Sequence, residues 1–132
     1  MWSFFAKMKD KNFEINAKIC LTHSFPNKDM QSIFGEIDCT EQEIRKMEME
    51  IHNYEYDDYD KLIQLCDSIC MAEGVCLLEV RLIDVARRYN ICNQGILNKW
   101  NAYFEIKKYF DDRCGINIYE LFYEEIIRNS IK

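Results

Sequence analysis

The chain has 132 residues, 48% of them hydrophobic, and a formal net charge of −6. With only 4 Gly and 1 Pro, the composition excludes collagen-like, disordered and turn-rich β proteins and suits one globular domain. The negative charge argues against direct nucleic-acid binding, which needs clustered Lys and Arg, and no stretch approaches the roughly 18 apolar residues of a membrane span.

The first 53 residues carry apolar side chains at helical spacing. This spacing predicts helices over residues 2–9 and 13–22, a break at residues 24–27, and a short helix or turn that ends at Gly35. Thr40 and Glu43 form a capping-box signature, which predicts a helix start. The helix behind it has an apolar stripe of Ile44, Met47 and Ile51.

The rest of the chain also predicts helices. Asp57 and Asp58 cap a helix that is expected to reach residues 73–74 and to bury Leu62, Leu65, Cys66 and Ile69. Residues 76–89 are apolar on several sides, which is typical of a central helix. Helices over 95–114 and 117–130 follow, the last one burying Ile118, Leu121, Phe122 and Ile126. We therefore predict an all-α helical bundle of about six to seven helices, one domain over residues 1–132 with one core.

Seven cysteines at irregular positions, with no signal peptide before them, predict a cytoplasmic protein with reduced thiols. Cys66 and Cys70 lie one helical turn apart, a spacing that could hold a metal ion. The favoured interpretation is that they are two small apolar residues on a buried helix face.

Few side chains suggest catalysis. The chain has two histidines and lacks a Gly-rich phosphate loop, a nucleophile elbow and a zinc cluster, so no catalytic residue is assigned. His52 is expected at an exposed helix end. His23 either faces a pocket or, as we favour, is a hydrogen-bonded structural residue. Asp67 lies in an apolar helix, and two alternatives stay open: a paired buried carboxylate or a solvated helix edge.

Several strings resemble the C-terminal part of small bacterial HD-domain phosphohydrolases. They are residues 17–26, 55–68, 73–81 and 84–89, followed by shorter strings at 99–100, 104–107 and 118–121. The resemblance implies metal-assisted hydrolysis of a phosphate ester, typically a nucleotide. It implies Asp67 and His23 as metal ligands. It also implies binding roles for residues within the matched strings: Thr22, Ser24, Lys61 and Arg81.

The family's early His and its His-Asp pair have no counterpart in this sequence. The resemblance therefore implies a catalytically incomplete HD-like domain. Such a domain would bind a nucleotide without hydrolysing it, or would bind a protein partner. No cofactor is expected for this chain alone. A divalent metal such as Mn, Fe or Ni is expected only if a complete site were assembled.

Two alternatives remain. The first is the C-terminal half of a split, metal-dependent nucleotide phosphohydrolase. The second is an acidic inhibitor of mobile-element origin that blocks a nucleic-acid-binding enzyme. It rests on residues 36–60, which hold ten acids against two bases, although a solvated helix face is the favoured interpretation.

A domain without its N-terminal helices should leave an apolar patch uncovered. We therefore expect a homodimer, or a protein partner that covers the missing helices, with Trp2 and Phe5 in the interface.

Overall fold

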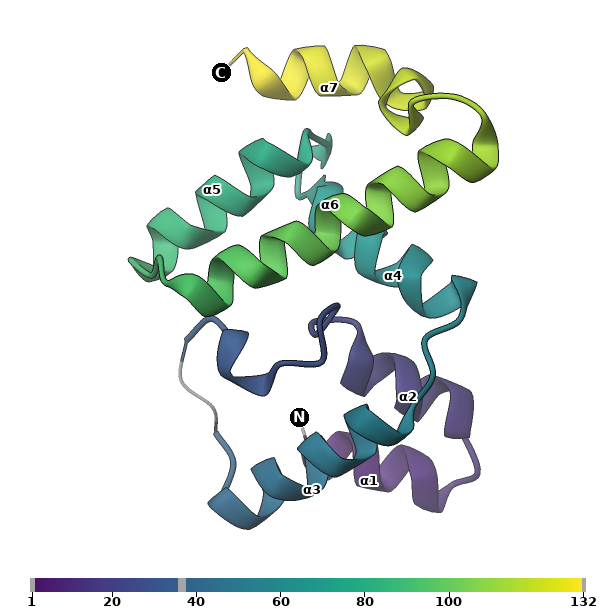
Figure 1. Ribbon diagram of the computed structural model, residues 1–132, viewed down its shortest axis with the longest axis vertical. Coiled ribbons are helices and arrows are strands. Elements are labelled where there is room, and N and C mark those ends of the chain that lie inside the picture. The colour runs from purple at the N-terminus through teal and green to yellow at the C-terminus, as the bar shows by residue number, and fades with distance from the viewer. Residues whose placement is uncertain (1, 36–37, 132) are drawn as a thin grey trace.

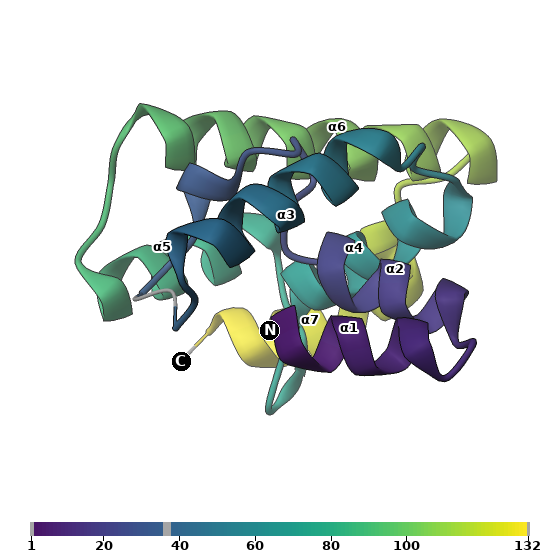
Figure 2. The same cartoon turned by 90° about the horizontal axis from the view of Figure 1, so that it is seen from below.

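The computed structural model describes residues 2–35 and 38–131, and this part of the chain is an all-α helical bundle, as predicted (Figure 1). Its α-helices are α1 (Trp2–Asp10), α2 (Glu14–Thr22), α3 (Glu41–Asn53), α4 (Asp58–Ile69), α5 (Leu78–Tyr89), α6 (Gln94–Cys114) and α7 (Tyr123–Ser130). Two 3₁₀ helices, η1 (Met30–Ser32) and η2 (Ile118–Phe122), and a hairpin of β1 (Cys70–Met71) and β2 (Gly74–Val75) complete the described part. Figure 2 shows α6 running along one side of the molecule.

The two predicted N-terminal caps are present. The Thr40 hydroxyl accepts from the backbone N–H of Glu43, and the Glu43 carboxylate accepts in return from the backbone N–H of Thr40. Asp57 and Asp60 form the same reciprocal pair at the start of α4. Because each pair satisfies donors that a helix start leaves free, these sequences fix where α3 and α4 begin.

Replacing Thr40 with Ala should lower the free energy of unfolding by about 1 kcal/mol, the usual loss for a removed N-cap acceptor. Urea denaturation of the purified variant measures this loss. The control is Gln42→Ala, an exposed change inside the same helix. Equal midpoints for the Thr40 variant and the unchanged protein would show that the cap contributes nothing.

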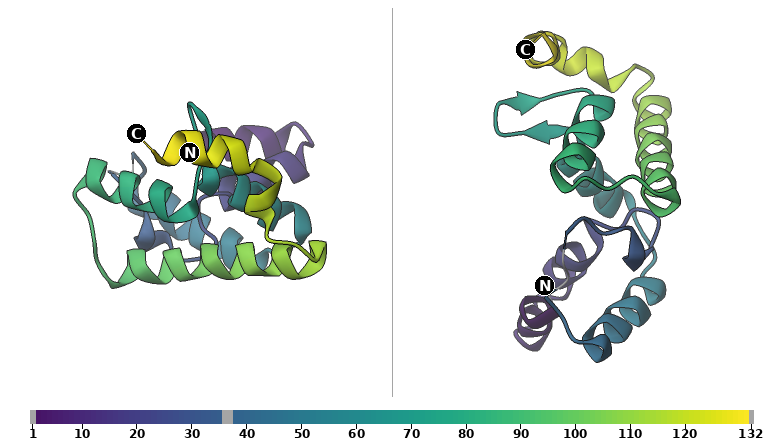
Figure 3. Two further views of the ribbon diagram at one scale, coloured as in Figure 1. Left: turned by 90° about the horizontal axis from the view of Figure 1, so that it is seen from above. Right: turned by 90° about the vertical axis from the view of Figure 1, so that its left-hand side faces the viewer.

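The end of α4 differs from the prediction. The helix stops at Ile69 instead of reaching residues 73–74, and the chain turns through the β1–β2 hairpin. The cause is tertiary: the backbone N–H of Val75 donates to Glu125, and the Asn129 side chain donates to the Val75 carbonyl. Both partners belong to α7, which lies beside the hairpin in Figure 3 and holds it through these two hydrogen bonds.

Several predicted core positions are exposed. Leu121 and Phe122 lie at the surface because residues 118–122 form a 3₁₀ helix, which turns them away from the core that Ile118 and Ile126 reach. Leu62 and Cys66 of α4 are exposed as well. The prediction of a central helix at 76–89 is also wrong, because α5 is amphipathic. Its buried residues are Leu78 and Leu82, whereas Ile83 is 52% exposed.

The apolar interior is divided, so the prediction of one core is wrong. The N-terminal core consists of Phe5, Ala17, Leu21, Phe25, Met30, Met47 and Ile51. The C-terminal core consists of Leu65, Ile69, Val75, Leu78, Leu82, Tyr103, Ile106, Ile118 and Ile126. In Figures 1 and 3, α1–α3 lie at one end of the molecule and α4–α7 at the other.

Buried polar residues join the two cores; we call them the polar seam. They are Thr22, Ser32, Asp60, Gln64 and Lys99, together with Lys18, which is partly buried. Asp60 is 2% exposed and accepts hydrogen bonds from Lys18 at 2.5 Å and from Thr22 at 3.2 Å. The Gln64 amide donates to the Thr22 carbonyl at 3.0 Å. The two halves are thus held together by hydrogen bonds between buried groups, although the Gln64 Oε1 atom has no hydrogen-bond donor among the described residues.

The aromatic residues at the chain start pack on this chain itself. Phe5 is 1% exposed and belongs to the N-terminal core, and the Trp2 ring lies 5.2 Å from it. Phe5 is therefore enclosed rather than presented to a partner. Phe4, which is 55% exposed, is the apolar side chain of α1 that faces outward.

Candidate anion-binding cavity

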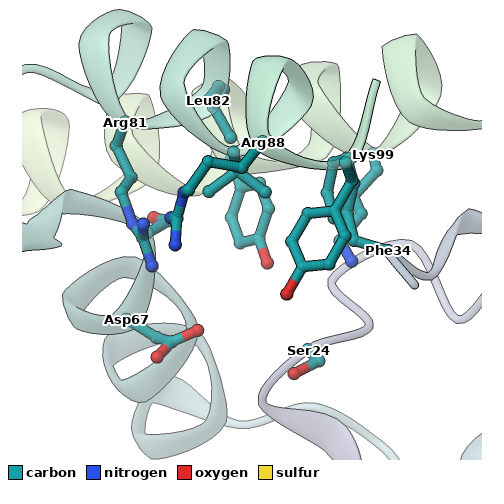
Figure 4. Close-up of a pocket in the computed structure, with 11 residues that line it drawn as sticks. Ser24, Phe34, Asp67, Arg81, Leu82, Arg88 and Lys99 are labelled. Atoms are coloured by element: carbon teal, nitrogen blue, oxygen red, sulfur yellow. The ribbon is translucent and has the colours of Figure 1, made fainter. Parts of the chain in front are cut away.

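A cavity of about 260 Å³ opens where the two halves meet. Figure 4 shows side chains from α4, α5, α6 and the segment after α2 converging on it. Its polar lining is Ser24, Asp67, Ser68, Arg81, Arg88 and Lys99, and its aromatic lining is Phe34, Tyr89 and Tyr103.

Helical spacing explains how these residues meet. Arg81 and Arg88 are seven positions apart on α5, which places them on one helix face two turns apart. Lys99 and Tyr103 are four positions apart on α6 and therefore share a face as well. One face of α5 and one face of α6 thus each contribute two side chains to the lining, and Asp67 of α4 lies below Arg81 in Figure 4.

The cavity has an excess of positive charge, although the chain is acidic. Among its described lining residues three are basic and one, Asp67, is acidic. One carboxylate oxygen of Asp84 serves both arginines, at 3.1 Å from Arg88 and 3.8 Å from Arg81. A single shared acid leaves guanidinium donors of both arginines free to bind an anion.

Lys99 is the most enclosed of the three cations, at 4% exposed. Its Nζ donates to the Ser32 carbonyl at 3.0 Å, and it lies 5.3 Å from the centre of the Phe34 ring. Burial lowers the pKa of Lys99 to about 8, while Asp67 and Asp29 oppose that change. Burial raises the pKa of Tyr103, so its hydroxyl remains a hydrogen-bond donor at neutral pH.

Three residues predicted from the resemblance meet in the cavity: Ser24, Asp67 and Arg81. The other two predicted binding residues are elsewhere. Thr22 is fully buried and donates to Asp60 in the polar seam, and the Lys61 ammonium lies 4.2 Å from the centre of the Tyr109 ring.

Sequence reasoning missed Arg88, Lys99 and Tyr103 as site residues. The seven-residue spacing from Arg81 to Arg88 was a usable signal, because it puts both on one face. Lys99 belongs to the matched string at 99–100, but its helical position gave no signal of a site, since a lysine in an amphipathic helix usually faces solvent.

The two residues expected as metal ligands have different surroundings in the structure. Asp67 lines the cavity and is exposed. Of the two alternatives left open for this residue, the structure agrees with the solvated helix edge and not with the paired buried carboxylate. His23 is not among the described lining residues, and its Nδ1 donates to the Cys20 carbonyl at 2.9 Å. Over residues 2–35 and 38–131 no three His, Cys, Asp or Glu side chains form a group that could hold a metal ion. Among the described residues, Asp67 and His23 therefore belong to no such group.

Two further expectations are changed by the structure. Cys66 and Cys70 are both exposed, so the interpretation of a buried pair is wrong. In the acidic segment, Asp60 is buried and Glu50 forms an ion pair with Lys9 at 2.9 Å, so the segment is not a uniformly solvated face. Glu36, the first acid of this segment, lies outside the described residues.

No described helix is both long and apolar enough to cross a membrane.

The comparisons with known proteins give no match. No protein-family model, no curated protein and no solved structure matches this chain.

Proposed function

We propose that this chain binds a small phosphorylated ligand, about the size of a mononucleotide, in the cavity between its two halves, and does not hydrolyse it. The observation that carries the proposal is the convergence of Arg81, Arg88 and Lys99 on one small cavity. A guanidinium presents a planar fork of donors that matches phosphate oxygens, and two such groups on one helix face suit a phosphate dianion.

The rest of the lining suits the remainder of such a ligand. The Phe34 and Tyr89 rings lie 5.7 Å apart and offer an apolar surface to a planar base or sugar face. Asp67 is an acceptor for ligand hydroxyl or N–H groups, and Ser24 and Tyr103 supply hydroxyls. At about 260 Å³ the cavity is near the lower end of ligand pockets, roughly 300–1,000 Å³, which favours one nucleotide or sugar phosphate. The resemblance to HD-domain phosphohydrolases independently favours a phosphate ester.

The proposal is tested by calorimetry with inorganic phosphate, ribose 5-phosphate and the four ribonucleoside monophosphates, each compared with its unphosphorylated counterpart where one exists. Arg88→Gln should weaken binding of a phosphorylated ligand about 10- to 100-fold, because a charge-assisted hydrogen bond contributes about 1.5–3 kcal/mol. Arg87→Gln is the matched control, since Arg87 is an exposed neighbour on the same helix and does not line the cavity.

Two results would contradict the proposal. One is equal affinity for nucleosides and nucleotides, since the arginines would then contribute nothing to recognition. The other is release of inorganic phosphate that Asp67→Ala abolishes, which would make the chain a hydrolase.

A further inference from the structure

The two buried lysines of α6 differ in how their charge is compensated. Lys107 Nζ donates to the Asp111 carboxylate at 2.6 Å and to the Asn117 side chain at 3.1 Å. Lys99 donates to a neutral carbonyl, that of Ser32, and no described carboxylate forms an ion pair with it. A buried ammonium is stable when a carboxylate compensates it, so Lys107 is a structural cation and Lys99 is not.

The surroundings of Lys99 favour its neutral amine. Burial lowers its pKa to about 8, so an appreciable fraction carries a free lone pair near neutral pH. A desolvated lysine of this kind is the usual nucleophile towards carbonyl groups. Lys99 also lines the cavity that holds Arg81 and Arg88, the pair to which the proposed function assigns the phosphate.

We infer that Lys99 forms a reversible imine with the carbonyl group of a phosphorylated aldehyde or ketone bound in this cavity. The inference rests on the proposed function and names the ligand class more narrowly. The two arginines hold the phosphate, and the amine is enclosed, since Lys99 is 4% exposed and its Nζ lies 5.3 Å from the centre of the Phe34 ring.

The step balances without any oxidant or reductant. The Nζ lone pair attacks the carbonyl carbon, the C=O π electrons move to oxygen, and a proton passes from nitrogen to oxygen to give a carbinolamine. That hydroxyl takes a proton from solvent and leaves as water, while the nitrogen lone pair forms the C=N bond. The iminium nitrogen then returns one proton to solvent to give the neutral imine. One water is released for each imine formed, and no atom changes oxidation state overall.

The test uses pyridoxal 5′-phosphate, a planar aldehyde with one phosphate, at one equivalent per chain. Sodium borohydride then reduces any imine to a stable secondary amine, which peptide mapping by mass spectrometry locates. We expect labelling of Lys99 at least about tenfold above that of any other lysine, equivalent to about 1.4 kcal/mol of preference. Lys107 is the internal control, because it is buried on the same helix and its amine is paired with Asp111.

Variants and a matched ligand sharpen the result. Lys99→Arg should remove the adduct, and Lys108→Arg, an exposed change on the same helix, should leave it intact. Circular dichroism establishes that the Lys99 variant is folded. Pyridoxal without the phosphate should label Lys99 at least about tenfold less, because the arginines then have no anion to hold.

Pyridoxine 5′-phosphate, which has an alcohol in place of the aldehyde, separates the two proposals. It should bind by calorimetry and compete with labelling. If it binds but Lys99 is not labelled by the aldehyde, the imine inference is wrong and the proposed function stands. If neither phosphate compound binds, both fail. Labelling spread evenly over exposed lysines would also overturn the imine.

Discussion

Replacing Asp60 with Ala is expected to lower the free energy of unfolding by about 3–5 kcal/mol, as for other broken buried ion pairs. Asp60 is 2% exposed and serves three donors: Lys18 Nζ at 2.5 Å, the Thr22 hydroxyl at 3.2 Å and the backbone N–H of Asp57 at 2.9 Å. Its loss would leave Thr22 buried without an acceptor and would remove half of the cap of α4.

Urea denaturation followed by circular dichroism measures this loss. A domain of this size has a total stability of about 5–15 kcal/mol, so the variant should unfold at a markedly lower urea concentration than the unchanged protein. Asp112→Ala is the matched control, because it removes an exposed ion pair to Lys108 and should cost under about 1 kcal/mol. Similar losses for the two variants would show that the polar seam contributes no more than a surface pair.

Replacing Lys99 with Met is expected to stabilise the fold by about 1–2 kcal/mol at pH 7 and to weaken ligand binding. Burial lowers the pKa of Lys99 from 10.5 to about 8, which at 1.36 kcal/mol per unit corresponds to a penalty on the order of 3 kcal/mol for the charged form. The lost hydrogen bond to the Ser32 carbonyl offsets roughly 1 kcal/mol of that gain.

The pH dependence of the stability difference between the Lys99→Met variant and the unchanged protein tests this explanation. The folded pKa of Lys99, about 8, is lower than the unfolded value, so the unfolded chain binds more protons between pH 8 and 10.5. Over that range the unchanged protein gains stability relative to the Met variant. The advantage of the variant should therefore be complete below pH 8 and disappear near pH 10.5. Urea midpoints at pH 7 and 10 measure it, and a difference that does not change with pH would contradict the explanation.

Local signals in the sequence predicted most helix starts correctly. Thr40 and Asp57 carry caps whose partners lie three residues away, so a short window contains everything needed. The end of α4 depends instead on Glu125 and Asn129, more than 50 residues later, which no local window can include. Helical periodicity also shows which face is buried but not against which neighbour, and so it predicted one core where two exist.

The candidate site was predicted only in part, because local signals again do not include long-range contacts. Ser24, Asp67 and Arg81 were found through matched strings, each read in its own segment. Lys99 became a site residue only when the fold placed α6 against the chain around Ser32, 67 positions away. The position of a buried charge depends on such long-range packing, and composition or spacing does not reveal it.

The divided core has a consequence for cooperativity. Each half buries its own apolar side chains, so one half can open without first exposing the interior of the other. Native-state hydrogen exchange would then give two levels of amide protection instead of one. The cavity has walls from both halves and exists only in molecules where both are closed. A ligand bound there would raise the population of that joint state by mass action, and the two units would unfold as one.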